Sequence, residues 1–180
     1  MPQERELSRW INLEKVALLT LDESVHGCKI LTQICRGFGI RNIRACTSVE
    51  DARNALNTSP FDLFIADPGA EAGGIELLRW LRREERNVNR FTPIILVSGH
   101  STPSAVRQAR DSGANFFVAK PLTPSTLLDR ILWVARDKRP FVEVGQYLGP
   151  DRRFKLEEPP SGAGRRTNDQ EKQEQAKGAA

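Results

Sequence analysis

Cysteine is scarce in this sequence, with three residues among 180 (Cys28, Cys35 and Cys46). An odd number without paired spacing argues against a disulfide framework of the kind found in small secreted domains. Cys28 and Cys35 are seven positions apart, which places them on one face of a helix. We therefore expect the cysteines to be small buried hydrophobic side chains.

Long hydrophobic runs are also missing. No apolar stretch approaches the roughly 20 residues that a helix needs to cross a bilayer. The first ten residues, MPQERELSRW, are too charged for a signal peptide. The sequence therefore predicts a soluble, cytoplasmic protein that has no contact with a membrane.

The charge balance is mildly basic, with a formal net charge of +4 and a pI of about 9.2. This balance permits contact with nucleic acid, acidic lipid or nucleotide but requires none of them, and a solvated surface is the simpler interpretation. Hydrophobic residues make up 39% of the chain and concentrate between Val16 and Val134. The core has to form within that region.

Short apolar runs alternate there with stretches of helical periodicity. The predicted strands cover residues 16–21, 43–46, 61–66, 93–97 and 116–119. The predicted helices cover 25–38, 49–56, 75–81, 101–112 and a last one from 127 that ends near Arg139-Pro140; Ser48 and Asp51 resemble a capping box for the second. Buried strands alternating with helices predict an α/β fold, a doubly wound five-stranded parallel sheet of order 2-1-3-4-5. In such a sheet ligands bind at the carboxyl ends of strands 1 and 3.

The character of the chain changes after Pro140. We expect an amino-terminal extension at 1–13, one domain at 14–139, a short segment at 140–156 that is apolar enough to dock on a surface, and a disordered tail at 157–180. No segment after Pro140 resembles a helix-turn-helix, a nucleotide cyclase or a kinase. A DNA-binding domain is therefore not expected, and any signal would pass through protein contacts.

The chemistry-bearing residues of the predicted domain follow its strands. Asp22 and Glu23 follow strand 1, Asp67 follows strand 3, Ser98 ends strand 4 and Lys120 follows strand 5. In a parallel sheet these side chains meet at one edge. Three close carboxylates repel one another unless a cation is present, and Mg²⁺ prefers such oxygen ligands. A carboxylate so placed suits nucleophilic attack on a phosphoryl donor, with Lys120 and Ser98 neutralising the transferred group.

Four sequence pieces carry a resemblance to a known family. They are LLTLDES (18–24), FDLFIADPGA (61–70), PIILVSGH (93–100) and GANFFVAKPL (113–122). In this order and spacing the chain resembles the receiver domain of two-component response regulators across roughly 15–138. The resemblance implies the flavodoxin-like fold of CheY-like proteins, and a binding module rather than an enzyme.

The resemblance also implies the ligands of a metal site. Asp67 matches the phosphoacceptor aspartate of the family. Asp22 and Glu23 match the acidic pair that holds Mg²⁺, and the backbone carbonyl of Gly69 matches the remaining protein ligand, beside Asp67 itself.

Further roles follow from the same match. Ser98 matches the hydroxyl residue that contacts the phosphoryl group, Lys120 matches the lysine of the family, and Pro121 would follow it through a cis peptide bond. Phe117 falls at the switch aromatic position, with plain core packing as the open alternative.

The sequence departs from the family pattern near the acceptor. The second acid is Glu23 rather than aspartate, Pro68 directly follows Asp67, Ala70-Glu71 replaces the usual Met-Pro pair, and Gly99 replaces a small alanine. These departures put the rate of phosphorylation in doubt, although none removes a group that the chemistry needs.

A basic set surrounds the last predicted helix and the tail: Arg136, Lys138, Arg139, Arg152 and Arg153. Solvated charge is one interpretation, and a site for a partner or an anion, including a nucleotide, is the other, because guanidinium groups match phosphate geometry.

The expected function is a phosphorylation-dependent binding module. A histidine kinase or phosphotransfer protein would donate to Asp67, and the face formed by the helix 101–112, the strand 116–119 and the last helix would change its affinity for a downstream protein. The alternative is a pseudo-receiver, a scaffold that binds its partner regardless of phosphorylation. An aspartyl-phosphate hydrolase is disfavoured, since it needs a second aspartate at position 69, where the chain has glycine.

Overall fold

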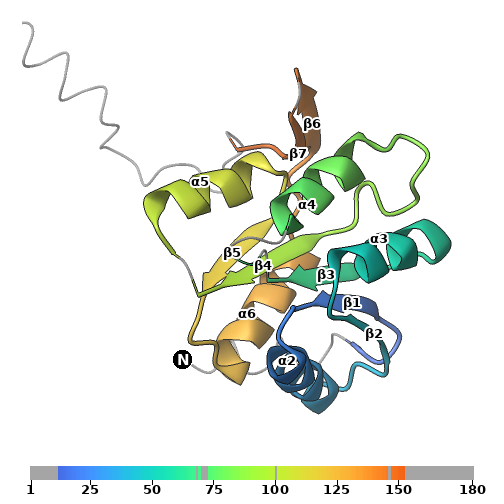
Figure 1. Cartoon of the computed structure of the whole chain (residues 1–180), viewed down its shortest axis with the longest axis vertical. Coiled ribbons are helices and arrows are strands. Elements are labelled where there is room, and N and C mark those ends of the chain that lie inside the picture. Colours follow the sequence, from blue (N-terminus) through green and yellow to red (C-terminus); the bar gives the residue numbers. More distant parts are fainter. Residues whose placement is uncertain (1–11, 68, 70–72, 100, 146, 153–180) are drawn as a thin grey trace, which may run out of the picture.

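The computed structural model of this chain describes residues 12–67, 69, 73–99, 101–145 and 147–152. Five parallel strands form one sheet in the order β2-β1-β3-β4-β5 (Figure 1). The strands are β1 (Ala17–Leu21), β2 (Asn42–Cys46), β3 (Leu63–Ala66), β4 (Ile94–Ser98) and β5 (Phe116–Ala119). The predicted fold class and strand order are confirmed.

Helices cover both faces of the sheet. They are α2 (Val25–Gly37), α3 (Val49–Thr58), α4 (Gly74–Arg83), α5 (Pro103–Asp111) and α6 (Pro124–Ala135). One core cluster joins the sheet to α3, α4 and α5, and the other joins it to α2 and α6. Figure 1 shows α2 and α6 together on one side and the other three helices on the opposite side.

Hydroxyl side chains start four of these helices. Ser24, Ser48, Thr102 and Thr123 each accept a hydrogen bond from the backbone N–H three residues further on, which satisfies one of the orphan donors of a helix start. Ser48 also donates to the carboxylate of Asp51 at 2.8 Å, so the predicted cap is present.

The last helix begins at Pro124, earlier than predicted, and it also ends earlier. It ends at Ala135, not near Arg139-Pro140. The Asp137 carboxylate accepts hydrogen bonds from the backbone N–H of Arg139 at 3.1 Å and from its guanidinium at 2.7 Å. A side chain that bonds its own nearby backbone offers the chain a turn in place of another helical turn.

A polar network ties the loops together at the amino-terminal end of the sheet. The fully buried Asn89 accepts from the N–H of Phe61 at 2.7 Å and donates to the carbonyls of Leu56 and Ser59, both at 2.8 Å. Thr92 donates to the Phe61 carbonyl at 2.9 Å. Because Phe61 is engaged here, β3 begins at Leu63 rather than at Phe61 as predicted.

Arg82 is the largest side chain of the fully buried set. Its guanidinium donates to the carbonyls of Gly113 at 3.1 and 3.2 Å, of Thr92 at 2.9 Å and of Arg90. Burial lowers the pKa of this guanidinium to about 9, so it stays charged at pH 7. The guanidinium of Arg82 thereby joins α4 to the segments that precede β4 and β5.

A hairpin follows the doubly wound unit. β6 (Phe141–Val144) and β7 (Tyr147–Pro150) pair in an antiparallel manner, within the segment 140–156 for which the sequence predicts docking. The Phe141 ring lies 5.0 Å from the guanidinium carbon of Arg82 and 5.6 Å from the ring of Phe91. Gly113 has φ of +87° and lies so close to β7 that a side chain on Gly149 would meet its Cα at 2.8 Å. The hairpin therefore packs against the amino-terminal end of the sheet.

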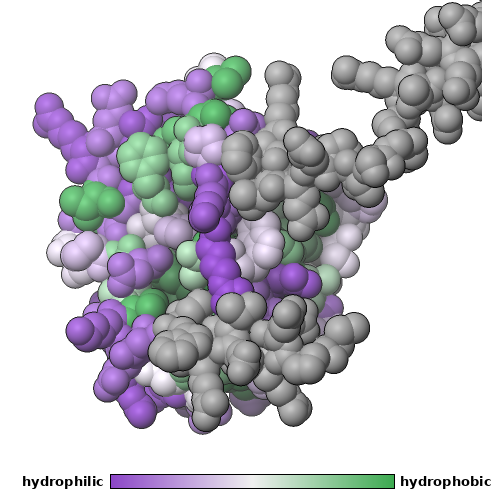
Figure 2. Space-filling model, turned by 180° about the vertical axis from the view of Figure 1, so that it is seen from behind, coloured by the Kyte–Doolittle hydropathy of each residue, from purple (hydrophilic) through white to green (hydrophobic). Residues whose placement is uncertain are grey.

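Most of the predicted amino-terminal extension and the predicted tail are not among the residues that the structure describes. Residues 1–11 of the predicted extension and the whole predicted tail 157–180 lie outside the described residues. Within the described part, no helix combines the length and the apolar character that crossing a membrane requires. Exposed hydrophobic residues form small separate groups among polar ones, as the view from behind shows (Figure 2).

The three cysteines are free and buried. Burial raises the pKa of Cys35 to about 12 and raises that of Cys46. Since the thiolate is the reactive form, we expect Ellman's reagent to label none of the three rapidly in native protein and all three in denaturant. Rapid labelling of Cys35 in native protein would contradict this placement.

Candidate functional site

Three charged residues occupy the positions directly after the strands of the sheet. The N–H of Asp22 bonds the carbonyl of Cys46 at 3.2 Å and that of Asp67 bonds Leu21 at 2.8 Å. The N–H of Lys120 bonds the carbonyl of Ser98 at 2.8 Å. The strand pairing thus continues for one more residue and delivers these side chains to the same edge.

Lys120 lies between two carboxylates. Its Nζ is 2.6 Å from Oδ2 of Asp67 and 3.2 Å from Oδ2 of Asp22. Partial burial alone would lower the pKa of Lys120, but the hydrogen bonds and charges of Asp67 and Asp22 outweigh it and raise that pKa. The Asp22 side chain is only 8% exposed, against 19% for Asp67 and 36% for Lys120. Asp67 is therefore the more accessible of the two carboxylates.

The carboxylate of Asp22 is held on its other side by the start of α2. The N–H of Ser24 donates to its Oδ1 at 2.9 Å. Gly27 faces the same carboxylate so closely that a Cβ there would come within 2.8 Å of Cγ of Asp22. Sequence reasoning missed this role of Gly27. The available signal was a glycine in the first turn of the helix that follows the acidic strand end, a position that disfavours glycine.

Gly69 turns the chain after Asp67. Its N–H donates to Oδ1 of Asp67 at 3.0 Å, and its φ is +64°, a conformation that glycine adopts without strain. The neighbours Pro68, Ala70 and Glu71, on which the sequence departs from the family pattern, lie outside the described residues.

The donor set of this edge fits a hard cation. Asp22 and Asp67 contribute carboxylate oxygens whose charge Lys120 partly balances, and oxygen ligands are those that Mg²⁺ prefers. Glu23, by contrast, is exposed. Among the described residues, no three acidic, histidine or cysteine side chains are grouped closely enough to hold a metal. The two aspartates thus lie together, and Glu23 does not join them.

The two predicted switch residues lie on neighbouring strands. Ser98 ends β4 and is 3% exposed. Phe117 is half-buried and packs against the core under α3, α4 and α5. The Lys120-Pro121 peptide bond is cis, as predicted.

Two arginines of the predicted basic set form ion pairs with aspartates of this chain. Arg139 pairs with Asp137 at 2.7 Å and donates to the carbonyl of Asn115 at 3.0 Å. Burial would raise the pKa of Asp137, but the hydrogen bonds and charge of Arg139 lower it. Arg152 pairs with Asp111 at 2.9 Å. Arg136 and Lys138 are exposed, and Arg153 lies outside the described residues. Arg139 and Arg152 thus hold parts of the structure together at separate points.

A mostly apolar cleft of about 250 Å³ adjoins the two aspartates. It lies between α2 and the segment after β5, and its apolar lining includes Ile30, Ile34 and Leu122. Ile30 is 43% exposed.

Comparison with known proteins agrees with the geometry. Residues 18–132 match the response regulator receiver domain family. This chain belongs to that family, and its fold and the recognised sequence pieces are those of a CheY-like receiver domain of two-component systems.

Particular relatives differ in length. The chain is 27% identical to the chemotaxis protein CheY of Pseudomonas aeruginosa over 117 residues, which is 63% of this chain and 91% of that protein. It is 26% identical to the sensory/regulatory protein RpfC of Xanthomonas campestris pv. campestris over 130 residues, 71% of this chain and 18% of RpfC. It is 31% identical to the transcriptional regulatory protein ZraR of Klebsiella oxytoca over 110 residues, 61% of this chain and 24% of ZraR. The chain therefore spans less than a quarter of the length of RpfC and ZraR.

Solved structures show the same fold. Chemotaxis response regulator CheY4 of Vibrio cholerae superposes with a TM-score of 0.60 at 22% identity, over 66% of this chain and 98% of that one. A putative response regulator from Chloroflexus aurantiacus gives 0.61 at 26% identity, over 67% and 98%.

Proposed function

We propose that Asp67 accepts a phosphoryl group from a histidine kinase or phosphotransfer protein, and that the aspartyl phosphate changes the affinity of this domain for a protein partner. The observation that carries the proposal is the ammonium of Lys120 bonded to both Asp67 and Asp22 at the carboxyl ends of the strands. It presents one accessible carboxylate beside a fixed positive charge.

The transfer step is a displacement at phosphorus. A carboxylate oxygen of Asp67 attacks the phosphorus of a phosphohistidine, the P–O bond forms as the P–N bond breaks, and the released imidazole takes up a proton. Lys120 neutralises charge on the phosphoryl oxygens. Asp22, Asp67 and the carbonyl of Gly69 would hold Mg²⁺, joined by Glu23 once its exposed side chain turns inward, and the ion when bound would add positive charge at those oxygens.

The response to phosphorylation involves Ser98 and Phe117. The hydroxyl of Ser98 would bond the phosphoryl group and Phe117 would repack, which alters the face formed by α5, β5 and α6. This is a shift between two conformations that a local charge event biases. The apolar cleft beside Asp67 supports a protein donor over a small molecule alone, because it offers contact area around the acceptor.

The alternative function is a scaffold that binds its partner without phosphorylation. The exposed side chain of Glu23, outside the pair of aspartates, is the observation that favours it. A scaffold of this kind would bind its partner equally well after Asp67→Asn.

Intact-protein mass spectrometry after incubation with acetyl phosphate and Mg²⁺ separates the two. We expect wild type to gain one phosphoryl group and Asp67→Asn to gain none. Asp129→Asn, an exposed aspartate of α6, is the matched control and should keep the gain. Folded wild-type protein that gains nothing, from acetyl phosphate or from a phosphorylated donor protein, would reject the phosphoacceptor function in favour of the scaffold.

A further inference from the structure

A second pocket borders α2, on a different side of this helix from the cleft beside Asp67. It lies between α2 and β2, the edge strand of the sheet (Figure 1). Its volume is about 310 Å³, at the lower end of the roughly 300–1,000 Å³ that small-molecule sites occupy. The complete lining is Val25, Cys28, Lys29, Thr32, Gln33, Arg36, Ala45 and Thr47.

The pocket carries positive charge that the chain does not neutralise. Its two cations, Lys29 and Arg36, are both exposed. Within the part of the chain that the structure describes, no carboxylate lines the pocket and neither cation forms an ion pair. Both side chains are therefore open to an anionic ligand.

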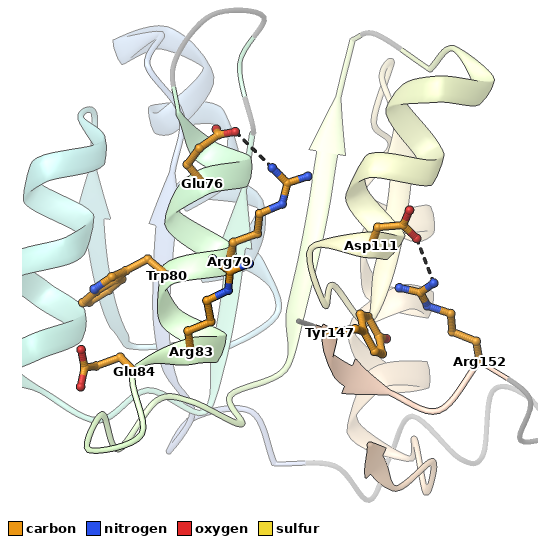
Figure 3. A pocket seen from close by; sticks show the side chains of 8 residues that line it. All are labelled: Glu76, Arg79, Trp80, Arg83, Glu84, Asp111, Tyr147 and Arg152. Atoms are coloured by element: carbon orange, nitrogen blue, oxygen red, sulfur yellow. Dashed lines mark hydrogen bonds and ion pairs between the residues drawn. The ribbon is translucent and has the colours of Figure 1, made fainter. Parts of the chain in front are cut away.

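A larger groove near the hairpin provides the contrast. It has a volume of about 770 Å³ and lies between α4, the end of α5 and the hairpin. Figure 3 shows Arg79 bonded to Glu76 and Arg152 bonded to Asp111 there, at 3.4 and 2.9 Å. Carboxylates of the chain thus already balance these two arginines, which is not the case for the cations beside α2.

A buried hydroxyl lies between the two cations along α2. Lys29 is three positions before Thr32 and Arg36 is four positions after it, so the three residues share one face of the helix. Oγ1 of Thr32 is buried and makes no hydrogen bond, a state that is costly for a polar group. A helical threonine can occupy either of two χ1 rotamers. Rotation about χ1 would therefore turn this hydroxyl toward a ligand that lies between Lys29 and Arg36.

The end of β2 adds an open backbone edge. The carbonyl of Cys46 accepts a hydrogen bond from the N–H of Asp22, on the side of β1, and β1 is the one strand that pairs with β2 in the described sheet. Backbone groups of successive strand residues point to opposite sides. The N–H of Ala45 therefore points away from β1, toward the open edge that lines the pocket.

These donors suit a phosphate group with an organic substituent. A phosphate has three terminal oxygens and up to two negative charges, which match an ammonium, a guanidinium and the polar side chains of Thr32, Gln33 and Thr47. Inorganic phosphate alone would leave much of the pocket unfilled, and ion pairs with exposed side chains contribute little by themselves. Val25, which is 58% exposed, and Cys28 offer apolar contact at one end of the pocket.

We propose that this pocket binds a small molecule that bears a phosphate monoester. The phosphate lies over Thr32 between Lys29 and Arg36, and the organic part lies against Val25 and Cys28. The ester is a bound ligand and not a phosphoryl donor, so no bond is made or broken. The site is separate from the phosphoacceptor chemistry of Asp67.

The test is an NMR titration of the ¹⁵N-labelled full chain with benzyl phosphate, in EDTA and without Mg²⁺. We expect saturable shifts of the backbone amides of Lys29, Thr32 and Ala45, with a dissociation constant below about 1 mM. The Lys29→Gln, Arg36→Gln double variant should bind roughly tenfold more weakly, because two charge-assisted contacts are lost. Thr32→Val, which lacks the hydroxyl, should bind about threefold more weakly.

The matched control is the Lys15→Gln, Arg86→Gln double variant, which removes the same two kinds of charge at exposed positions outside the pocket. It should bind as wild type does, and circular dichroism should show that every variant is folded. Asp67→Asn should also bind as wild type does, which keeps this result independent of the phosphoacceptor function.

Two further ligands test the chemical class. Inorganic phosphate should bind more weakly than benzyl phosphate, and benzyl alcohol should not bind. Equal affinity for inorganic phosphate would overturn the assignment to an ester. Absence of binding to wild type, shifts confined to residues around Asp67, or equal weakening in the control would overturn the site itself.

Discussion

Replacing Arg82 with methionine is expected to lower the free energy of unfolding by roughly 3–5 kcal/mol, the cost typical of removing one member of a buried polar network. Methionine fills much of the volume but cannot donate. The carbonyls of Gly113, Thr92 and Arg90 would then lose their guanidinium donor, and an unsatisfied buried acceptor costs about 1–3 kcal/mol. Phe141 would lose its stacked cation as well.

Urea denaturation followed by circular dichroism measures this effect. The control is Arg83→Met, the same change at the next, exposed position of α4, where we expect a change within about 0.5 kcal/mol, as for most surface substitutions. Similar losses for both variants would show that the buried hydrogen bonds of Arg82 contribute little to stability.

Gly27→Ala is expected to destabilise the protein even though alanine is the better helix former. A Cβ at position 27 would collide with the Asp22 carboxylate, and overpacking of this kind costs roughly 1–3 kcal/mol. Relief of the collision has to move Asp22, which also bonds Lys120. We therefore also expect slower phosphorylation by acetyl phosphate, by about tenfold for each 1.4 kcal/mol by which the displaced Asp22 and Lys120 stabilise the transition state less.

Gly37→Ala is the matched control at the other end of α2. No atom lies within 4 Å of a Cβ built there, so the helix propensity of alanine should act alone and stabilise the protein by up to about 1 kcal/mol. The two Gly→Ala changes should thus differ in sign in urea denaturation, and only the first should slow phosphorylation. If Gly27→Ala also stabilises the protein and leaves the rate unchanged, the tight approach to Asp22 is not a constraint.

The sequence allowed prediction of the sheet because its strands are short apolar runs. Apolar residues make up most of β1, β3 and β4, which are buried almost throughout. The helices between the strands carry apolar residues at regular spacing. Strand ends follow from the same pattern, so Asp22, Asp67 and Lys120 could be placed at one edge before their contacts were known.

The remainder depends on contacts between distant parts of the chain, which periodicity does not encode. From the sequence, Arg82 is expected to be a surface arginine like Arg83, and only the fold shows that Arg82 is buried while Arg83 is exposed. The strands of the hairpin were not predicted either, because β7 contains Gly149 and Pro150, two residues that disfavour strands. The need for glycine at position 27 is visible only when the Asp22 carboxylate is placed beside it.

The two ends of the sheet differ in the hydrogen bonds that side chains make there. At the amino-terminal end, Asn89 and Arg82 each bond several backbone groups from different loops, and Thr92 donates to the carbonyl of Phe61. The hairpin packs over this network. At the carboxyl end, the ammonium of Lys120 connects Asp22 and Asp67, which follow β1 and β3. We therefore expect a change in charge at Asp67 to alter the contacts at the carboxyl end of the sheet more than those at the amino-terminal end, where the hairpin packs.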